Sequence, residues 1–574
     1  MASERSGTTS SGTVDQLIDS IRSAVIGRGD LVAGPFGLRP VVYADYTASG
    51  RSLDFIEDYL RDAVLPLYAN THSESSGTGL QTTRFREDAR AIVGRCLGAT
   101  DEHAVLFCGS GSTYAIAKLI GVLGLRIPSE LDDRYRFTEQ IPDDERPVVF
   151  IGPFEHHSNE IPWRESIADV VTIDEDADGH VDLVQLEAEL ERHAERPLLI
   201  GSFSAASNVT GIITDTAAVS SLLHRYDALA CWDFAAAAPY VGIDMGSADD
   251  PDGAYLDAVF VSPHKLIGGP GTPGVLVARR ELFRNRVPVV PGGGTVAYVN
   301  PEDHDYLDDI EHREEGGTPA IVESIRAGLV FQLKEAVGVD EIRRREERFV
   351  RRAIERWEQH PNIEILGSRE AERLSIVSFV IRHGDRHLHH NFVVAVLNDL
   401  FGIQSRGGCS CAGPYGHRLL GIDLDRSLAF EREITRGCEG VKPGWVRLNF
   451  NYFIDEDTFE YLLDAVELVA TEGASLLPLY RFEPDVGTWR HRDGLAEPPM
   501  SLHDVEYGPD GLLHTDRRHR GGSVRLEQYL EDARRLCASA RAEPPAPLAP
   551  PDTTGDFEQL RWFPYPVEAV EPRS

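Results

Sequence analysis

The chain has 574 residues, enough for two or more structural units with a large core. Its 57 basic and 93 acidic side chains give a formal net charge of −36, which argues against nucleic acid or an anionic membrane as partner. Seven cysteines, mostly isolated, argue against a disulfide framework. No signal peptide and no apolar run of about 18 residues is apparent. We therefore expect a soluble cytoplasmic protein.

The amino-terminal region combines a polar start with one amphipathic segment. Residues 1–13 are rich in Ser, Thr and Gly, and we expect them to be flexible. Apolar residues at helical spacing predict a short helix over Val14–Ile26. We assign residues 14–50 to the amino-terminal part of a smaller domain.

Residues 51–337 alternate short apolar runs with helical patterns. The runs are continuously apolar, which is typical of a sheet covered by helices on both faces, an α/β fold. In such folds ligands bind beyond the carboxyl ends of the strands. The charged stretches Pro128–Pro147 and Asp169–His193 are expected to form surface insertions or exposed helices. The predicted strands are Ala104–Cys108, Pro147–Ile151, Pro197–Gly201, Ala228–Trp232 and Ala258–Val261.

The rest of the chain is predicted to form a smaller domain and an extension. Residues 338–479 contain apolar runs at Ser375–Ile381 and Trp445–Phe450, which we predict to be strands. Residues 480–574 are rich in Pro, Arg and acidic residues, and Pro544–Pro551 is typical of an extended linker. We expect this extension to be partly disordered.

Lys265 is one of only four lysines in the chain, and it follows a predicted strand in the tetrapeptide Ser262–Lys265. Arginine cannot be deprotonated in a protein, whereas a lysine can be tuned to form a Schiff base. A strand that ends in Ser-Pro-His-Lys before a glycine-rich turn is a candidate site for pyridoxal phosphate. A surface lysine on a turn is the alternative.

Three further segments follow predicted strands. Asp233 closes one strand and could pair with the nitrogen of a pyridine ring, or could cap a helix. Ser110–Thr113 opens a predicted helix, whose amino terminus could bind a phosphate or form a simple capping turn. His156, within Glu155–Asn159, could stack on a flat cofactor ring or be an exposed loop histidine.

Two segments of the smaller domain carry candidate substrate groups. Arg447 lies inside an apolar strand, where its guanidinium could bind a substrate carboxylate or form an internal salt bridge. Arg406–Pro414 is a glycine- and proline-rich loop in which Cys411 could be a mobile nucleophile or, with Cys409, one of two inert thiols. The spacing of these two cysteines also permits a metal or redox site. No second pair completes a zinc set, so we expect no metal.

In their order and chemistry these motifs resemble the class V aminotransferase fold of fold-type I pyridoxal phosphate enzymes. The cysteine desulfurase/selenocysteine lyase branch is the most similar, over roughly residues 40–470. The resemblance implies an α/β fold with a large, mainly parallel seven-stranded sheet domain and a smaller α+β domain, here followed by an extension. It also implies pyridoxal 5′-phosphate as cofactor and a homodimer.

The resemblance implies specific roles around the cofactor. Lys265 would hold it covalently and later shuttle protons at the substrate α-carbon. His156 would stack on the ring, and Asp233 would pair with its nitrogen. The residues implied to hold the phosphate are Ser112, Thr113, Ser262, His264 and, from the neighbouring subunit, Thr318 of the segment Glu315–Pro319.

The resemblance also implies roles toward the substrate. Asn208 would lie near the cofactor's phenolic oxygen and the substrate, while Arg447 would bind the α-carboxylate and Arg406 would also contact the substrate. Cys411 matches the family's catalytic cysteine, which takes sulfur or selenium from the substrate as a persulfide and leaves alanine. A sulfur-acceptor protein is then a possible partner.

The sequence departs from the family pattern at several positions. Ala236 stands where the family has Gln or His, and Cys409 adds a second thiol to the loop. The long stretch between Cys411 and Arg447 remodels the mouth of the expected site. These changes leave an alternative open, a pyridoxal phosphate-dependent C–S lyase, epimerase or aminotransferase acting on another amino acid or thiol metabolite. A non-enzymatic scaffold is a third possibility, against which Lys265 and Asp233 argue.

Overall fold

The computed structural model describes residues 11–71, 74–494, 500–509, 511–513, 519–520 and 525–569. The chain divides into two compact units. Unit 1 comprises residues 1–26, 46–347 and 370–374, and unit 2 comprises residues 27–45, 348–369 and 375–574. Helix α1 runs over Ser11–Ala24, so it begins earlier than the predicted helix. Residues 1–10 of the segment expected to be flexible lie outside the described residues.

Unit 1 contains a seven-stranded sheet in the order β4-β10-β9-β8-β7-β5-β6. The strands β5 to β9 pair in parallel, and only β10 runs antiparallel to both of its neighbours, β4 and β9. The large, mainly parallel seven-stranded sheet predicted from the sequence is therefore confirmed. Its strands are β4 (His103–Cys108), β5 (Val148–Ile151), β6 (Asp169–Thr172), β7 (Leu199–Ser204), β8 (Leu229–Asp233), β9 (Ala258–Val261) and β10 (Gly274–Arg279).

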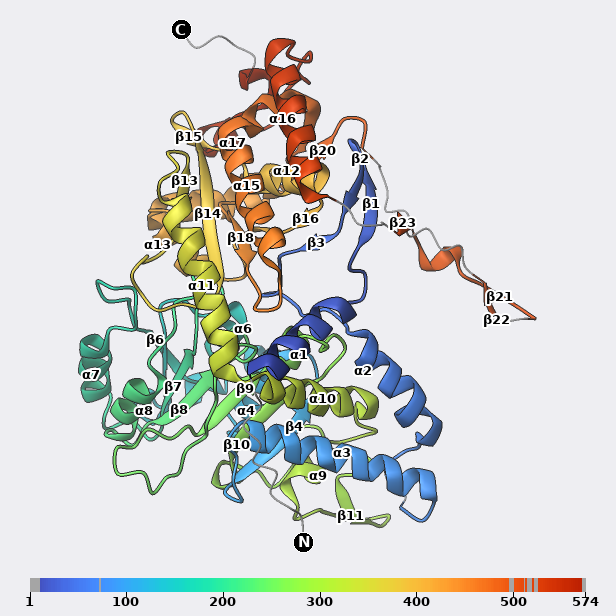
Figure 1. The fold of residues 1–574 in the computed structure, drawn as a ribbon. Helices are drawn as coiled ribbons and strands as arrows, with labels where there is room; N and C mark the ends of the chain where they lie inside the picture. Colours follow the sequence, from blue (N-terminus) through green and yellow to red (C-terminus); the bar gives the residue numbers. More distant parts are fainter. Residues whose placement is uncertain are drawn as a thin grey trace. The chain divides into compact units, whose positions relative to one another are not determined.

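Helices pack on the sheet of unit 1, as the continuously apolar strands require. Helices α3 and α10 lie side by side (Figure 1), and a Cβ atom on Gly328 of α10 would stand only 2.8 Å from the Cα atom of Ala89 in α3. The absence of a side chain at Gly328 thus permits this close approach. The helices that flank the strands are α3 (Gly77–Cys96), α4 (Gly111–Val122), α6 (His157–Arg164), α7 (Leu183–Arg192), α8 (Thr216–His224) and α10 (Ile321–Val337).

The charged stretch Asp169–His193 does not form only an insertion or an exposed helix. Its first four residues are β6, the edge strand of the main sheet, and the exposed helix α7 follows. Asp169 pairs with Arg146 at 3.1 Å and with Arg196. Edge strands are commonly short and charged, which is why the apolar pattern did not reveal this one.

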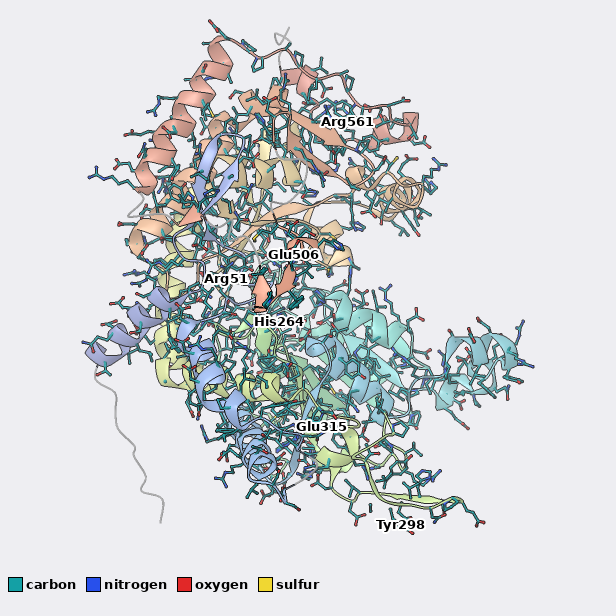
Figure 2. All side chains as sticks on the ribbon, turned by 90° about the vertical axis from the view of Figure 1, so that its right-hand side faces the viewer. Arg51, His264, Tyr298, Glu315, Glu506 and Arg561 are labelled. Carbon is teal, nitrogen blue, oxygen red and sulfur yellow. The ribbon has the colours of Figure 1, made fainter. Side chains whose placement is uncertain are left out.

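An exposed hairpin also belongs to unit 1. Strands β11 (Val296–Val299) and β12 (His304–Tyr306) pair antiparallel with a register shift between Val296 and Tyr298. Figure 2 shows Tyr298 near the outer end of this hairpin, where the residue is 64% exposed. Of the described residues, no helix is long and apolar enough to cross a membrane.

Unit 2 combines an antiparallel sheet with helices, as expected for an α+β domain. The sheet has the order β13-β14-β18-β17, with β15 also paired to β14. A parallel pair, β3 (Val42–Tyr43) with β16 (Ile403–Gln404), links the amino-terminal segment to this unit. The bounds of the main elements of this unit are β13 (Ile363–Ile365), β14 (Ile376–His383), β15 (Arg386–His387), β17 (Arg406–Gly408), β18 (Trp445–Asn449), α12 (His390–Phe401), α14 (Leu424–Thr435) and α15 (Glu456–Glu472).

Residues beyond 479 contribute to the core of unit 2. Strands β19 (Tyr480–Glu483) and β20 (Thr488–His491) and helices α16 (Leu526–Ala542) and α17 (Gly555–Leu560) supply apolar side chains to one buried cluster with β14 and α12. Residues 544–551 form no helix or strand. Some residues of the extension that we expected to be partly disordered lie outside the described residues. They are 495–499, 510, 514–518, 521–524 and 570–574.

Candidate active site

The sheet of unit 1 brings most of the predicted cofactor residues to one edge. Strands β4, β5, β7, β8 and β9 share one direction, so their carboxyl ends lie at the same edge of the sheet, where α/β folds bind ligands. The predicted residues at or just after these ends are Ser112 and Thr113 (β4), His156 (β5), Asn208 (β7), Asp233 (β8), and Ser262, His264 and Lys265 (β9).

Asp233 and Lys265 are electrostatically coupled at this edge. Asp233 is 4% exposed, and its Oδ1 accepts a hydrogen bond from the N–H of Ala235 at 2.8 Å. Burial raises the pKa of Asp233, while the Ala235 N–H, the charge of Lys265 and the Ser112 hydroxyl oppose that rise. Burial, aided by Lys265, also lowers the pKa of His264 to about 4, so this imidazole is neutral near pH 7. The site thus holds a buried acid beside an amine.

The amino terminus of α4 forms a cradle for an anion. The N–H of Ser112 donates to the Oγ of Ser262 at 2.8 Å, which ties the first turn of α4 to the end of β9. Gly111 has a φ of 61°, and a Cβ atom there would lie 2.8 Å from the same Oγ. A side chain at this position would fill the cradle. The N–H groups of a helix amino terminus and the helix dipole favour a phosphate there.

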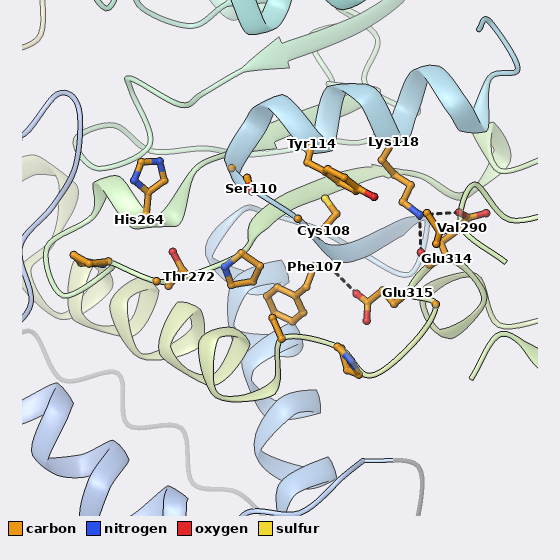
Figure 3. Close-up of a pocket in the computed structure, with 18 of the residues that line it drawn as sticks. Phe107, Cys108, Ser110, Tyr114, Lys118, His264, Thr272, Val290, Glu314 and Glu315 are labelled. Atoms are coloured by element: carbon orange, nitrogen blue, oxygen red, sulfur yellow. Dashed lines mark hydrogen bonds and ion pairs between the residues drawn. The ribbon is translucent and has the colours of Figure 1, made fainter. Parts of the chain in front are cut away.

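A cavity of about 720 Å³ adjoins this cradle (Figure 3). Its wall includes Gly109–Gly111, His264 and Thr272. The Oγ1 atom of Thr272 is buried and has no hydrogen-bond partner among the described residues. Because buried hydroxyls are normally satisfied, this atom fits a site whose remaining partner is a bound polar group. Together with the cradle, the lining fits the phosphate of the cofactor that the sequence predicts.

Buried ion pairs close the far side of the cavity. Lys118, 3% exposed, donates to the carbonyl of Glu314 at 2.6 Å and pairs with its carboxylate at 3.2 Å, as Figure 3 shows. Burial alone would raise the pKa of Glu315, but Arg90 and Arg86 hold it below the ordinary value. The Glu315 carboxylate also accepts from the N–H of Phe107 at 2.6 Å. These bonds fix the chain just before Thr318.

Thr318 itself lies on the surface of unit 1. It is exposed, and its Oγ1 accepts a hydrogen bond from the Nδ2 of Asn70 at 3.2 Å. An exposed position is compatible with contact to a neighbouring subunit, and that role remains a prediction.

Asn208, by contrast, is 8% exposed in the turn after β7. Among the described residues, no group of three or more His, Cys, Asp or Glu side chains could hold a metal ion.

His156 lies at the start of α6 and is connected to Thr113. Its Nδ1 accepts from the N–H of Ser158 at 3.1 Å and lies 3.0 Å from the Ser158 Oγ. That hydroxyl lies 2.6 Å from the Oγ1 of Thr113. The hydrogen bonds fix the ring at the carboxyl end of β5. Stacking of this ring on a cofactor stays a prediction.

Glu155 is a further buried acid of the site, to which the sequence analysis gave no role. It is 4% exposed, and its carboxylate accepts from the Asn159 Nδ2 at 2.6 Å and from the N–H and Oγ of Ser204 at 2.9 and 2.6 Å. Burial raises its pKa to about 7, and nearby Asp233 adds to the rise. An acidic residue four positions after a buried strand and beside His156 was the available signal.

We expect Glu155 to make the stability of the protein depend on pH. The folded state holds its proton more tightly than the unfolded chain, so this contribution to stability is lost as pH rises from about 4.5 through about 7. The expected loss is about 3 kcal/mol by pH 8. Glu155→Gln carries no titrating proton, so its free energy of unfolding should gain that amount relative to wild type between pH 4 and 8.

Denaturant unfolding at a series of pH values measures this difference. Glu145→Gln, at an exposed carboxylate, is the matched control and should follow the wild-type curve. Asp233 contributes in the same direction in both proteins, because its pKa is also raised. Parallel curves for wild type and Glu155→Gln would show that the pKa of Glu155 is the same in the folded and unfolded states.

The other predicted residues, Arg406, Cys411 and Arg447, belong to unit 2. Arg447 is 3% exposed on β18, and its Nη2 donates to the Oδ1 of Asp45 at 2.8 Å. The internal salt bridge considered as an alternative is therefore present. Arg406 is exposed and lies opposite Arg447 in the pairing of β17 with β18. Their contacts with a substrate remain predictions.

The cysteine loop contains an unusual turn. The N–H of Ala412 donates to the carbonyl of Cys409 at 3.1 Å, and the two residues between them, Ser410 and Cys411, have φ values of 51° and 57°. Left-handed backbone at residues other than glycine costs of order 1 kcal/mol each and clusters at functional sites. Cys409 and Cys411 are half-buried free thiols. The loop therefore presents Cys411 in a strained turn immediately after β17.

Comparisons with known proteins agree with the motifs. The sequence model of the family described as "Aminotransferase class-V" matches residues 42–424. The chain is 28% identical over 382 residues to "Cysteine desulfurase" from Dickeya dadantii, covering 66% of this chain and 84% of the relative. It is 27% identical over 379 residues to "Probable cysteine desulfurase" from Halalkalibacterium halodurans, covering 65% and 85%.

A solved structure shares the fold. The apo structure of a cysteine desulfurase from Thermococcus onnurineus superposes with a TM-score of 0.60 at 23% identity, covering 75% of this chain and 95% of that one. The resemblance stated from the sequence is confirmed at the level of fold and family. The relatives cover 65% and 66% of this chain and the solved structure covers 75%, so part of this chain lies outside the region that each of them matches.

Proposed function

The chain belongs to the aminotransferase class-V family, and on that premise we propose that it is a pyridoxal phosphate-dependent cysteine desulfurase. In this proposal it removes sulfur, or selenium, from L-cysteine or selenocysteine and leaves L-alanine. The observation that carries the proposal is the buried Asp233 coupled to Lys265 at the carboxyl edge of the sheet, beside the α4 cradle. The relatives from Dickeya dadantii and Halalkalibacterium halodurans carry the names cysteine desulfurase and probable cysteine desulfurase.

The residues that would hold the cofactor come from unit 1. The α4 cradle with Ser112, Ser262 and Thr272 would take the phosphate, and Asp233 would face the ring nitrogen. When bound, the cofactor supplies an electron sink that acidifies the α-carbon of an amino acid substrate. Asp233 favours this function because its negative charge stabilises a protonated ring nitrogen.

Lys265 would move the proton at the substrate's α-carbon. Its ε-amine can be deprotonated, unlike a guanidinium, so it can accept and return that proton. Cys411 would act on the sulfur. Its thiolate attacks the substrate sulfur, an S–S bond forms, the bond between sulfur and the substrate β-carbon breaks, and that carbon takes up a proton. The products are alanine and a Cys411 persulfide, with no external oxidant or reductant required.

We also propose how the protein assembles and works in the cell. Exposed Thr318 in a Gly-Thr-Pro turn favours a homodimer in which it completes the neighbour's phosphate site. The Cys411 persulfide implies an acceptor for its sulfur, which we expect to be a protein. The free cysteines favour a reducing compartment, the cytoplasm.

Incubation of the purified, cofactor-loaded protein with L-cysteine tests the proposed function. We expect alanine in amounts that match the protein-bound and reducible sulfur. Pyruvate, ammonia and free sulfide in place of alanine would support the alternative, a C–S lyase. The Arg447–Asp45 ion pair and Ala236 leave that alternative open. Absence of both alanine and pyruvate would contradict both activities toward this substrate.

A further inference from the structure

The carboxyl-terminal segment, residues 554–569, lies beyond the region that the family model matches, which ends at residue 424. It contains α17 and the aromatic residues Trp562, Phe563 and Tyr565. Phe563 and Tyr565 are buried in the core of unit 2, whereas Trp562 packs against that core from its edge. The position of Trp562 connects this segment to the backbone that precedes the cysteine loop.

Trp562 stacks on two consecutive histidines at the start of α12. Its ring centroid lies 5.2 Å from that of His389, at an interplanar angle of 14°, and 5.7 Å from that of His390, at 15°. The two histidine rings lie 4.3 Å apart. The Trp562 Nε1 donates to the carbonyl of Val441 at 3.0 Å, which fixes the orientation of the indole.

His390 in turn packs against the strand that leads into the cysteine loop. A Cβ atom on Gly407 would lie 3.2 Å from the His390 Cδ2. A Cβ atom on Gly444 would lie 2.7 Å from the Gly408 Cα and 2.9 Å from the His390 Cε1. The ring of His390 thus fills the space beside Gly407 and Gly444, Gly444 itself lies against Gly408, and Cys409 follows Gly408 directly.

The histidine rings are suited to packing rather than to charge. Burial lowers the pKa of His389 to about 3, and burial together with His389 and Lys442 holds the pKa of His390 well below its ordinary value. The His389 Nε2 lies 3.1 Å from the carbonyl of Gly440. The His390 Nδ1 has no hydrogen-bond partner among the described residues. The position of His390 is therefore set by packing, with the ring of His389 on it at 4.3 Å and the indole of Trp562 at 5.7 Å.

Ion pairs within the segment fix its conformation around Trp562. Arg561, labelled in Figure 2, pairs with Glu568 at 2.8 Å and with Glu558 at 2.9 Å, and its guanidinium lies over the ring of Tyr565. The Thr554 hydroxyl donates to the buried carboxylate of Glu433 at 2.7 Å. Arg386 of β15 pairs with Glu568 at 3.3 Å, so the segment is anchored to the rest of unit 2 on both sides of Trp562.

We propose that Trp562 is a positioning residue for the cysteine loop. Through His390 it holds Gly407 directly and Gly408 by way of Gly444, and so the strained turn that carries Cys411. This inference rests on the proposed function only for the group that the Cys411 thiol attacks. The mechanical link from Trp562 through His390 to the cysteine loop does not depend on that function. Loss of the indole lets His390 move and releases the backbone that precedes Cys409, without touching the cofactor residues of unit 1.

The test compares Trp562→Leu with wild type in the full-length, cofactor-loaded protein. Mass spectrometry measures the rate at which iodoacetamide alkylates Cys411. This rate is divided by the alkylation rate of Cys96, a half-buried thiol of unit 1. We expect this ratio to rise about fivefold, which corresponds to a modest local loosening. The rate of persulfide formation in the first turnover should fall. In steady-state turnover kcat should fall as well, with KM for L-cysteine unchanged.

Two variants separate positioning from general destabilisation. Trp562→Phe keeps an aromatic ring against both histidines and should restore most of the wild-type ratio. Phe557→Leu alters a fully buried ring of the same segment that packs near Phe482 instead, and should lower the melting temperature without moving the ratio. A ratio within twofold of wild type in Trp562→Leu, or an equal change in Phe557→Leu, would overturn the proposal.

The readouts also distinguish this inference from the proposed function. Alkylation needs no substrate, so a changed Cys411 ratio in a protein that forms no alanine would support the link and contradict the desulfurase. An unchanged ratio in a protein that does form alanine would contradict only the link.

Discussion

Lys265→Ala is expected to abolish turnover of L-cysteine. We expect a loss of about 100- to 10,000-fold in kcat, the usual range for removal of a general acid–base group. The variant should also lose the visible absorbance of covalently held cofactor. Measurement of alanine release and of the absorbance spectrum after cofactor loading checks both effects.

Lys265→Arg is the matched control for charge. Arginine keeps a positive charge beside Asp233 but cannot be deprotonated. We expect it to be as inactive as Lys265→Ala, although it should preserve more of the electrostatic coupling to Asp233. Substantial activity in Lys265→Arg would show that the site needs only a cation there, and the assignment of Lys265 would be wrong.

Cys411→Ser is expected to stop sulfur removal while leaving the cofactor site intact. A hydroxyl is a much weaker nucleophile toward sulfur than a thiolate. Loss of about 3 kcal/mol of transition-state stabilisation corresponds to about 100-fold in the rate of alanine formation, and we expect at least that. Rapid-quench measurement of alanine in a single turnover, with the cofactor spectrum recorded in parallel, checks this result.

Cys409→Ser provides the control within the same turn. Cys409 precedes the two residues with left-handed backbone, whereas Cys411 is one of them. We expect Cys409→Ser to keep the first turnover near the wild-type rate. If Cys409→Ser lost alanine formation and Cys411→Ser kept it, the nucleophile would have to be reassigned to Cys409.

The sequence was sufficient to predict the edge of the sheet that carries the cofactor residues. Each buried parallel strand is a continuous apolar run, and the first polar residue after it marks the carboxyl end. Asp233 and Lys265 were found in this way, and the structure couples them electrostatically. Strand β6 was missed because its pattern is that of an exposed edge, with Asp169 engaged by arginines.

Pairs that are distant in sequence could not be predicted. Asp45 and Arg447 are 402 residues apart, so no local pattern indicates which carboxylate neutralises the buried guanidinium. The contact between Trp562 and His390 is of the same kind. The composition of the extension suggested disorder, because its charged residues outnumber the few aromatic side chains that are buried in unit 2.

Glu155 illustrates a different limit. Its position after β5 was visible in the sequence, but its raised pKa depends on burial and on three hydrogen bonds from Asn159 and Ser204. These partners come from α6 and from β7, and only the folded sheet brings them together. Spacing along the chain predicts where a titratable group lies, whereas its protonation depends on tertiary packing.

The most direct test of the account is the location of the sulfur after reaction with L-cysteine. Trypsin cleavage after Arg406 and Arg418 releases residues 407–418, which contain Cys409 and Cys411. Peptide fragmentation should show one added sulfur atom on Cys411 in the wild-type protein, and none in Lys265→Ala. Alanine formation without sulfur on Cys411, or sulfur bound equally in Lys265→Ala, would contradict the proposed desulfurase.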